Sequence, residues 1–188
     1  MRVQLRIVAG SLRGRKLLCD IHAGVRPTPQ MVREALFSIL GNAVPGRLFI
    51  DVFAGTGAIG LEALSRGAGE VMFVERDQRL AGDIERHLRA FGVADQAHVV
   101  RTDVYRWAER WPAPAEPVSV FISPPFADYQ QRLDALQSLL LDLENKVARE
   151  SVLVLQGEKS EGFDALLTTH PWELHRYSRN LLAIWVKE

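Results

Sequence analysis

The middle of the chain alternates between short, continuous apolar runs and longer segments in which apolar residues recur every three or four positions. Runs of the first kind are typical of buried strands, and segments of the second kind are typical of helices. The predicted strands are residues 48–53, 71–74, 98–101, 118–122 and 151–155. The predicted helices are residues 29–40, 61–66, 80–91, 105–111, 128–143 and 163–169. This alternation predicts an α/β, Rossmann-like fold, with a mainly parallel sheet covered by helices on both faces.

A hairpin is predicted at each end of the chain. Residues 172–177 and 181–186 are apolar or alternating around a polar turn, which favours a C-terminal antiparallel hairpin that completes a seven-stranded sheet. At the N-terminus, short runs around Gly10 and Gly14 predict a β-hairpin outside the main sheet. We therefore divide the chain into a basic N-terminal β-hairpin arm, residues 1–25, and a main domain, residues 26–188.

The sequence also predicts the cap of the first helix and the solvent exposure of three helix residues. Thr28 is expected to cap the first helix, with Pro29 at its first helical position. The apolar spacing of that helix leaves Arg33 and Glu34 on the predicted solvent-exposed face. His87, on the third helix, is also predicted to be exposed and without a role.

The composition is that of a globular protein. The 188 residues are 47% hydrophobic and 24% charged, which suits one domain with a substantial core. No apolar run approaches the roughly 20 residues of a membrane span, and the N-terminus does not resemble a secretory signal, so we expect a cytoplasmic protein without a membrane partner. Cys19 is the only cysteine, which excludes an internal disulfide and a cysteine-based zinc site. We expect no metal.

Charge is unevenly distributed, although the formal net charge of the chain is zero. Residues 1–26 carry a net charge of +5, and the remainder carries −5. Such clustering favours a polyanionic partner. The candidate RNA-binding residues are Arg6, Arg13, Arg15, Lys16 and Arg26. The alternative for the hairpin is a solvated basic edge strand, and Arg26 is also placed to approach a cofactor.

A glycine-rich turn follows the first strand of the main domain. Gly55, Gly57 and Gly60 permit positive φ angles and close approach of a ligand, and the helix that they open presents unpaired N–H groups. The spacing also fits a dinucleotide fingerprint, with Glu75 as the hydroxyl-binding acid. Asp51 favours S-adenosylmethionine instead, because its carboxylate can pair with the ammonium group of that cofactor, whereas a pyrophosphate gains nothing from it.

Polar residues stand at or just beyond the ends of successive predicted strands, namely Asp51, Glu75, Asp103 and Ser123. In parallel α/β sheets, ligands bind outside the carboxyl ends of the strands, at the switch point of the topology. We therefore predict that one cleft collects these four side chains.

Three segments in a fixed order carry a family resemblance, namely RIVAGSLRGRKL, RPTPQMVREALFSIL and DVFAGTGAIGLEALSRGA. Together with Glu75, Asp103 and the Pro-Pro-Phe motif, they resemble the class I S-adenosylmethionine-dependent methyltransferases, and among these the RsmD-type 16S ribosomal RNA guanine-N2 methyltransferases. The resemblance implies that residues 26–188 form the methyltransferase domain and methylate the exocyclic amine of one guanine. It also implies 16S rRNA or the assembling small ribosomal subunit as partner, and we expect a monomer.

The resemblance assigns roles in cofactor binding by position. Asp51 and the backbone at Gly55 and Gly57 would hold the methionine part of S-adenosylmethionine. Glu75 would bind the ribose hydroxyls, and Asp103 the adenine amino group. For Asp103, capping the next helix is an equally good interpretation.

The catalytic motif begins with Ser123, where the family usually has Asp or Asn. A guanine amine attacks a sulfonium methyl only when acceptors hold its hydrogens and aim its lone pair. The hydroxyl of Ser123 and the carbonyl of Pro124 are suited to this, and cytosine-N4 methyltransferases often carry the same Ser-Pro-Pro sequence. Phe126 would stack on the target base after it leaves its helix or loop, or would simply close the core.

Three other functions remain open at this point. A nicotinamide-dependent reductase would use the same glycines and Glu75, but it leaves Asp51 and the Ser-Pro-Pro-Phe motif unexplained. A ribosome-assembly protein that binds RNA would have lost catalysis through Ser123. A cytosine-N4 methyltransferase acting on DNA would have little room for a target-recognition domain in 188 residues.

Overall fold

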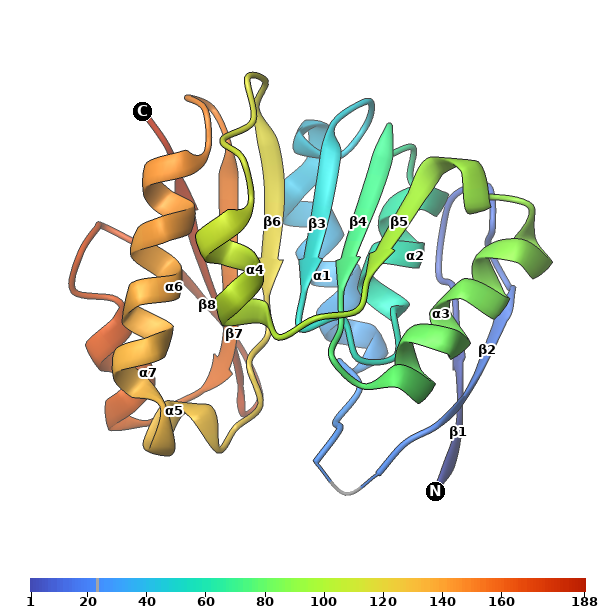
Figure 1. Ribbon diagram of the computed structural model, residues 1–188, viewed down its shortest axis with the longest axis horizontal. Helices are drawn as coiled ribbons and strands as arrows, with labels where there is room; N and C mark the ends of the chain where they lie inside the picture. The colour runs from blue at the N-terminus through green and yellow to red at the C-terminus, as the bar shows by residue number, and fades with distance from the viewer. Residues whose placement is uncertain (23) are drawn as a thin grey trace.

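The computed structural model describes residues 1–22 and 24–188, and its centre is a seven-stranded sheet (Figure 1). The strand order is β5-β4-β3-β6-β7-β9-β8. The strands run in one direction except β9, which is antiparallel to its neighbours β7 and β8. The strands are β3 (Leu48–Val52), β4 (Glu70–Val74), β5 (Ala97–Val100), β6 (Val118–Ile122), β7 (Val152–Glu158), β8 (Glu173–Tyr177) and β9 (Asn180–Val186). The predicted mainly parallel sheet with a C-terminal antiparallel hairpin is confirmed.

Helices cover both faces of the sheet, which gives three layers (Figure 1). The first apolar cluster joins the sheet to α1 (Gln30–Leu40), α2 (Ala58–Ser65) and α3 (Gln78–Phe91). The second joins it to α4 (Val104–Arg110), α6 (Leu133–Lys146) and α7 (Glu161–Leu166). Short helices occur at α5 (Asp128–Gln131), η1 (Gly41–Ala43) and η2 (Ala94–Gln96). In the part of the chain that the structure describes, no helix is both long and apolar enough to cross a bilayer.

The N-terminal hairpin forms a separate two-stranded antiparallel sheet, as predicted, from β1 (Arg2–Arg6) and β2 (Lys16–Asp20). Its inward-facing residues Ile7, Leu17 and Cys19 belong to the same apolar cluster as α2 and α3. The hairpin and the main domain therefore share one core.

Polar contacts fix the hairpin against α2. The buried carboxylate of Glu62 accepts hydrogen bonds from the backbone N–H groups of Val8 (2.9 Å) and Ala9 (3.1 Å). At Gly10 the two backbones come so close that a Cβ atom there would lie 1.7 Å from the carbonyl oxygen of Ser65. The basic loop of the hairpin is thus held in a defined place.

Two predictions of exposure are wrong, because the hairpin covers the residues concerned. Arg33 is buried, and its guanidinium donates hydrogen bonds of 2.9 Å to the carbonyl oxygens of Thr28 and Arg6. His87 is buried as well, and its Nε2 accepts a hydrogen bond of 3.1 Å from the N–H of Leu18. Arg33 thus joins the hairpin to α1, and His87 joins it to α3.

The predicted cap of the first helix is also wrong. Pro29 occupies the cap position, and α1 begins at Gln30. The Thr28 hydroxyl instead donates a hydrogen bond of 2.9 Å to Oε1 of Gln156 in β7. This bond ties the segment before α1 to the carboxyl edge of the sheet.

Candidate functional site

A cavity of about 800 Å³ lies at the carboxyl edge of the sheet. It brings together most of the predicted site residues, namely Arg26, Asp51, Gly55, Glu75, Asp103, Ser123, Pro124 and Phe126. The predicted single cleft is therefore present. Gly57 lies beneath the turn rather than in the wall.

Asp51 is the most deeply buried ionisable group of the cavity wall, with an exposed fraction of 1%. Its Oδ2 accepts a hydrogen bond of 2.9 Å from the N–H of Gly60 in α2. Burial raises the pKa of Asp51 to about 8; the Gly60 hydrogen bond opposes this shift, and the negative charge of Glu75 adds to it. A buried carboxyl of this kind gains stabilisation when a cation binds beside it.

The glycine turn needs glycine for two different reasons. Gly55 (φ 55°) and Gly57 (φ 72°) are in the left-handed region. A Cβ atom at Gly57 would lie 2.7 Å from Ile84, and one at Gly60 would lie 2.2 Å from the ring of Phe73. Gly55 thus presents its backbone to the cavity. Gly57 and Gly60 instead allow α2 to pack closely against α3 and β4.

Glu75 connects the turns that follow β3 and β4. Its Oε2 accepts a hydrogen bond of 2.7 Å from the N–H of Gly55, and its Oε1 accepts one of 2.8 Å from the N–H of Asp77. Each carboxylate oxygen has further acceptor capacity. Glu75 therefore supports the glycine turn while it lines the cavity, a structural role that its sequence position did not reveal.

Asp103 caps α4, as one of its two interpretations predicted. Its Oδ1 accepts hydrogen bonds from the N–H groups of Tyr105 (3.1 Å) and Arg106 (3.4 Å). Its Oδ2 lies 3.9 Å from the guanidinium of Arg132, which is stacked 4.0 Å above the centre of the Tyr105 ring. The cap fixes the carboxylate at the wall of the cavity, so capping is compatible with ligand binding.

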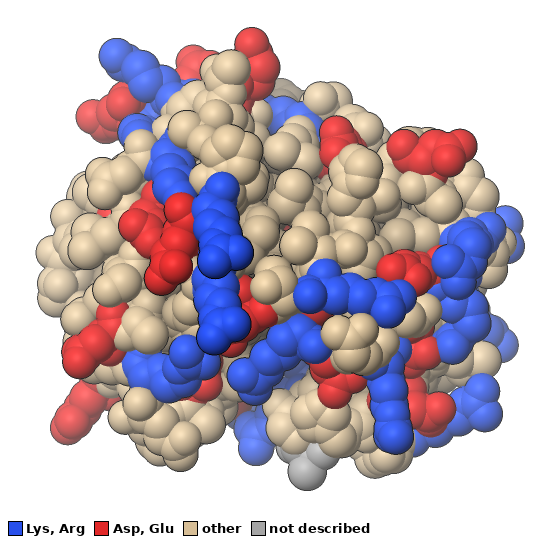
Figure 2. Space-filling model, viewed as in Figure 1, with Lys and Arg blue, Asp and Glu red and all other residues tan. Residues whose placement is uncertain are grey.

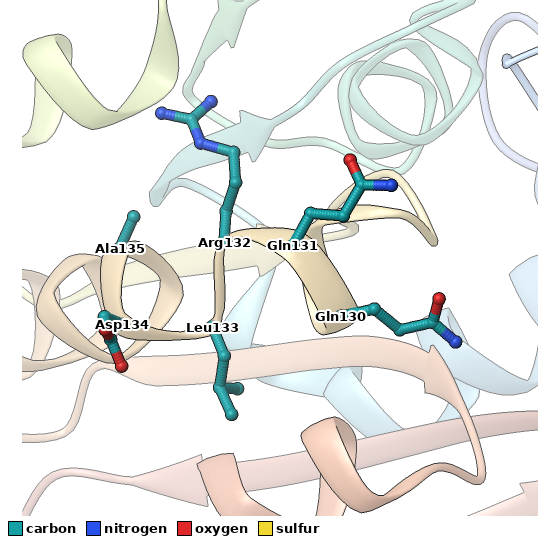
Figure 3. A pocket seen from close by; sticks show the side chains of 6 residues that line it. All are labelled: Gln130, Gln131, Arg132, Leu133, Asp134 and Ala135. Carbon is teal, nitrogen blue, oxygen red and sulfur yellow. The ribbon is translucent and has the colours of Figure 1, made fainter.

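A second, shallower depression of about 480 Å³ lies beside this cluster, where the chain turns from α5 into α6. Residues 130–135 line it (Figure 3). The predicted helix from residue 128 is broken here, because Arg132 has a non-helical backbone. In Figure 3 the Arg132 side chain points away from Leu133. Since Gln131 and Arg132 also line the main cavity, we regard the depression as its outer margin.

The Ser-Pro-Pro-Phe motif follows β6 directly. Ser123 is half-buried, and its N–H donates a hydrogen bond of 3.3 Å to the carbonyl oxygen of Val52, next to Asp51 in β3. Pro124 is buried, and the Phe126 side chain is 41% exposed, with its ring 6.5 Å from that of Tyr129. An exposed aromatic ring at the rim of a cavity is available for stacking on a planar ligand.

The cavity wall also contains residues that the sequence analysis did not predict. Tyr129 is buried and donates a hydrogen bond of 2.6 Å to the carbonyl oxygen of Gln156. The Gln156 side chain accepts from Thr28 and donates to Asn180, 3.3 Å away. No sequence motif marks these residues: the pairing of β7 with β9 brings Gln156 near Asn180, and packing of α5 and of the segment before α1 brings Tyr129 and Thr28 to Gln156.

Of the predicted RNA-binding residues, only Arg26 lines the cavity. Arg6, Arg13, Arg15 and Lys16 are exposed on the hairpin. Arg15 lies over the Phe91 ring, 5.5 Å from its centre. Figure 2 shows basic side chains gathered over the lower right of the molecule, where Figure 1 draws β1, β2 and α3. Acidic side chains lie among them.

Among residues 1–22 and 24–188, no group of three or more His, Cys, Asp or Glu side chains is arranged to hold a metal ion. The cavity instead combines acidic groups, open backbone and an exposed aromatic ring, which suits a cationic organic cofactor and a planar substrate.

Residues 5–184 match the protein family described as Conserved hypothetical protein 95. The chain belongs to this family. Its relatives include ribosomal RNA small subunit methyltransferase D of Escherichia coli K12, which is 33% identical over 92% of this chain and 83% of the relative. The protein of the same name from Haemophilus influenzae is 32% identical over 91% of this chain and 86% of the relative. The resemblance to the RsmD-type methyltransferases is confirmed.

Solved structures of similar proteins agree with the family assignment. The Escherichia coli protein yhhF, described as a candidate methyltransferase, is 30% identical, with a TM-score of 0.78 over 99% of both chains. A Thermus thermophilus 16S rRNA N2 G1207 methyltransferase, solved with AdoMet and guanosine, shares the fold at 21% identity. Its TM-score is 0.75, over all of this chain and 50% of the other. The predicted class I methyltransferase fold is confirmed.

Proposed function

We propose that this protein transfers a methyl group from S-adenosylmethionine to the exocyclic N2 amine of a guanine in 16S ribosomal RNA. The observation that carries the proposal is the position of Asp51 and Ser123 at the ends of the neighbouring strands β3 and β6, in one cavity. The names of the relatives support a small-subunit rRNA substrate.

The acidic half of the cavity suits the cofactor. S-adenosylmethionine carries an ammonium and a sulfonium group, and the buried Asp51 carboxylate would pair with the ammonium. Glu75 would accept hydrogen bonds from the ribose hydroxyls, and Asp103 from the adenine amino group. The backbone at Gly55, which lines the cavity, would lie against the methionine part, while Gly57 shapes the turn.

The Ser-Pro-Pro-Phe motif suits an amine as the nucleophile. The Ser123 hydroxyl and the Pro124 carbonyl would accept hydrogen bonds from the two amine hydrogens, which aims the nitrogen lone pair at the methyl carbon. Alignment of nucleophile, methyl and sulfur supplies much of the rate enhancement. The new N–C bond forms as the S–C bond breaks, and the amine then loses a proton to water. Phe126 would stack on the guanine.

RNA beyond the target nucleotide would contact the hairpin. Arg6, Arg13, Arg15 and Lys16 would meet phosphates along one exposed surface, and Arg26 would meet them at the cavity. The fixed position of the hairpin suits recognition of a defined RNA shape, such as an assembling small subunit. We propose that the protein acts as a monomer.

The decisive experiment uses 16S rRNA and small subunits from cells that lack this protein. Incubation with methyl-labelled S-adenosylmethionine should place the label in N2-methylguanosine, identified by digestion and mass spectrometry. Label in N4-methylcytidine would favour the cytosine alternative. Cofactor and RNA binding without any transfer would favour the inactive assembly protein.

A further inference from the structure

Two arginines from distant parts of the chain converge on one carboxylate oxygen at the mouth of the cavity. Nη1 of Arg26 lies 3.8 Å from Oε1 of Glu158, and Nε of Arg179 lies 3.4 Å from the same oxygen. The arginine side chains are 68% and 72% exposed, and the Glu158 side chain is 29% exposed. Two cations therefore share one anion at an exposed site.

The sheet topology places this group on the far side of Ser123 from the acidic half of the cavity. Glu158 is the last residue of β7 and pairs with Asn180, the first residue of β9. Arg179 therefore lies at the same edge of the sheet as the ends of the parallel strands. In the strand order, β7 and β9 follow β6 on the side opposite to β3, β4 and β5.

A chain of two hydrogen bonds joins the two segments that carry the arginines. The Thr28 hydroxyl, two residues after Arg26, donates to Oε1 of Gln156 at 2.9 Å. Nε2 of the same glutamine donates to Oδ1 of Asn180, next to Arg179, at 3.3 Å. The segment before α1 and the β8–β9 turn are thus held by one amide group.

The chemistry of this arrangement favours a phosphate ligand. One nitrogen of each arginine lies within 3.8 Å of the same Glu158 oxygen, so the two guanidinium groups are close enough to bind one phosphate together. Guanidinium groups bind phosphate oxygens in a planar, bidentate way. Because both arginines are largely exposed, their ion pairs with the Glu158 carboxylate are weak, so a phosphate can replace that carboxylate.

We propose that Arg26 and Arg179 form a clamp for a backbone phosphate beside the target nucleotide, and that Glu158 occupies the clamp until RNA replaces it. This inference rests on the proposed function, and it adds Arg179 and Glu158 to the RNA-contacting residues. A base that enters the cavity toward Ser123 leaves its own sugar-phosphate backbone at the mouth. Strands in a sheet are about 4.8 Å apart, so β7 and β9 place the clamp one to two strand spacings to the side of Ser123, with Glu158 two residues beyond the position level with Ser123.

The test measures binding of 16S rRNA as a function of salt for the wild-type protein and for Arg26→Ala, Arg179→Ala and Glu158→Gln. Each arginine variant should weaken binding and lower the slope of log affinity against log salt by about 0.7 to 0.9. Glu158→Gln should strengthen binding, and this gain should disappear when Arg26 and Arg179 are also replaced. Arg149→Ala is the matched control, because this exposed arginine precedes β7, at the opposite end of that strand.

These variants should lower affinity for RNA far more than affinity for S-adenosylmethionine, because Glu158 and Arg179 lie beyond Ser123 from Asp51, Glu75 and Asp103, and Arg26 contacts Glu158. Single-turnover methyl transfer should rise toward the wild-type rate as the RNA concentration approaches saturation. An unchanged salt slope in Arg179→Ala would overturn the clamp. Weaker RNA binding by Glu158→Gln would overturn the displacement and point to direct contact between Glu158 and a base. A wild-type protein that binds RNA but transfers no methyl group would contradict the proposed function. The binding data would still decide whether the clamp exists. Absence of RNA binding would overturn both proposals.

Discussion

Glu75 and Gly55 are joined by a hydrogen bond of 2.7 Å from the backbone N–H of the glycine to Oε2 of the carboxylate. The acid proposed to bind the cofactor ribose therefore also holds the turn that the cofactor contacts. Loss of this side chain removes two interactions at once, one with the ligand and one within the protein.

Replacing Glu75 with Ala should weaken S-adenosylmethionine binding by about 1.5 to 3 kcal/mol, the usual contribution of a hydrogen bond to a charged group. Isothermal titration calorimetry measures this change. Stability should also fall, since the N–H groups of Gly55 and Asp77 lose their acceptor. Glu75→Gln is the matched variant, because it keeps one acceptor oxygen. A folded Glu75→Ala protein with wild-type affinity would exclude the ribose role.

Binding of S-adenosylmethionine should depend on pH through Asp51. Because burial raises the pKa of Asp51 to about 8, this carboxyl is largely protonated at neutral pH. An ammonium group beside it favours the charged form, so binding should release a proton, and affinity should rise with pH up to about 8. Calorimetry at pH 7 in two buffers with different ionisation enthalpies counts the protons released. Zero protons would contradict the pairing.

The Asp51→Asn variant separates binding from stability. In the ligand-free protein, the raised pKa means that the folded state favours the protonated carboxyl of Asp51. This contribution to the free energy of unfolding is complete at pH values below the pKa of Asp in the unfolded chain, and it is lost as the pH rises toward 8. The asparagine variant should therefore be at least as stable as the wild type at pH 8 in urea unfolding, although it binds the cofactor more weakly. Lower stability of the variant than of the wild type at pH 8 would show that burial of the charged Asp51 carboxylate does not destabilise the ligand-free protein.

Two glycines of the hairpin form a matched pair for testing how firmly the hairpin is docked. Gly10 and Gly14 have nearly the same backbone angle, with φ 83° and 84°. A Cβ atom at Gly10 would lie 1.7 Å from the Ser65 carbonyl oxygen, whereas one at Gly14 would meet nothing within 4 Å. Gly14→Ala should cost about 1 to 3 kcal/mol for the strained backbone alone. Gly10→Ala should cost clearly more in urea unfolding, and equal costs would argue against rigid docking.

The sequence predicted most of the sheet and the position of the cleft, because contiguous apolar runs and strand-end acids are local signals. It did not predict the burial of Arg33 and His87, since their partners come from the hairpin, far away in the chain. The roles of Tyr129 and Gln156 also depend on long-range packing and on the register of β7 with β9. Local patterns identify the edge of the sheet where a site forms, but pairing between distant strands decides which other side chains reach it.

The basic side chains of the hairpin should contribute to RNA binding through their charge. Replacing Arg13, Arg15 and Lys16 together with Gln should weaken 16S rRNA binding and flatten its salt dependence by about 0.7 to 0.9 for each phosphate that the variant no longer binds. Affinity for S-adenosylmethionine should stay unchanged, because none of these residues lines the cavity. A triple variant with the wild-type salt slope would show that the hairpin is a solvated basic edge.

Ser123 provides the sharpest test of the catalytic proposal, because the family resemblance leads us to expect Asp or Asn at this position. If its hydroxyl accepts a hydrogen bond from the target amine, Ser123→Ala should slow methyl transfer in single-turnover experiments while cofactor affinity stays close to wild type. A neutral hydrogen bond is typically worth about 0.5 to 1.5 kcal/mol, so the expected loss is roughly two- to tenfold.

Ser123→Asn is the informative companion variant, since it restores an acceptor that the family uses. Higher activity of the asparagine variant would show that acceptor reach limits the reaction in this protein; lower activity would be ambiguous, because the half-buried site has to accommodate a larger side chain. The alanine variant is therefore the decisive one. Equal single-turnover rates for wild type and Ser123→Ala would mean that the hydroxyl does not orient the amine, which would leave the Pro124 carbonyl and the Phe126 ring as the groups that position the base.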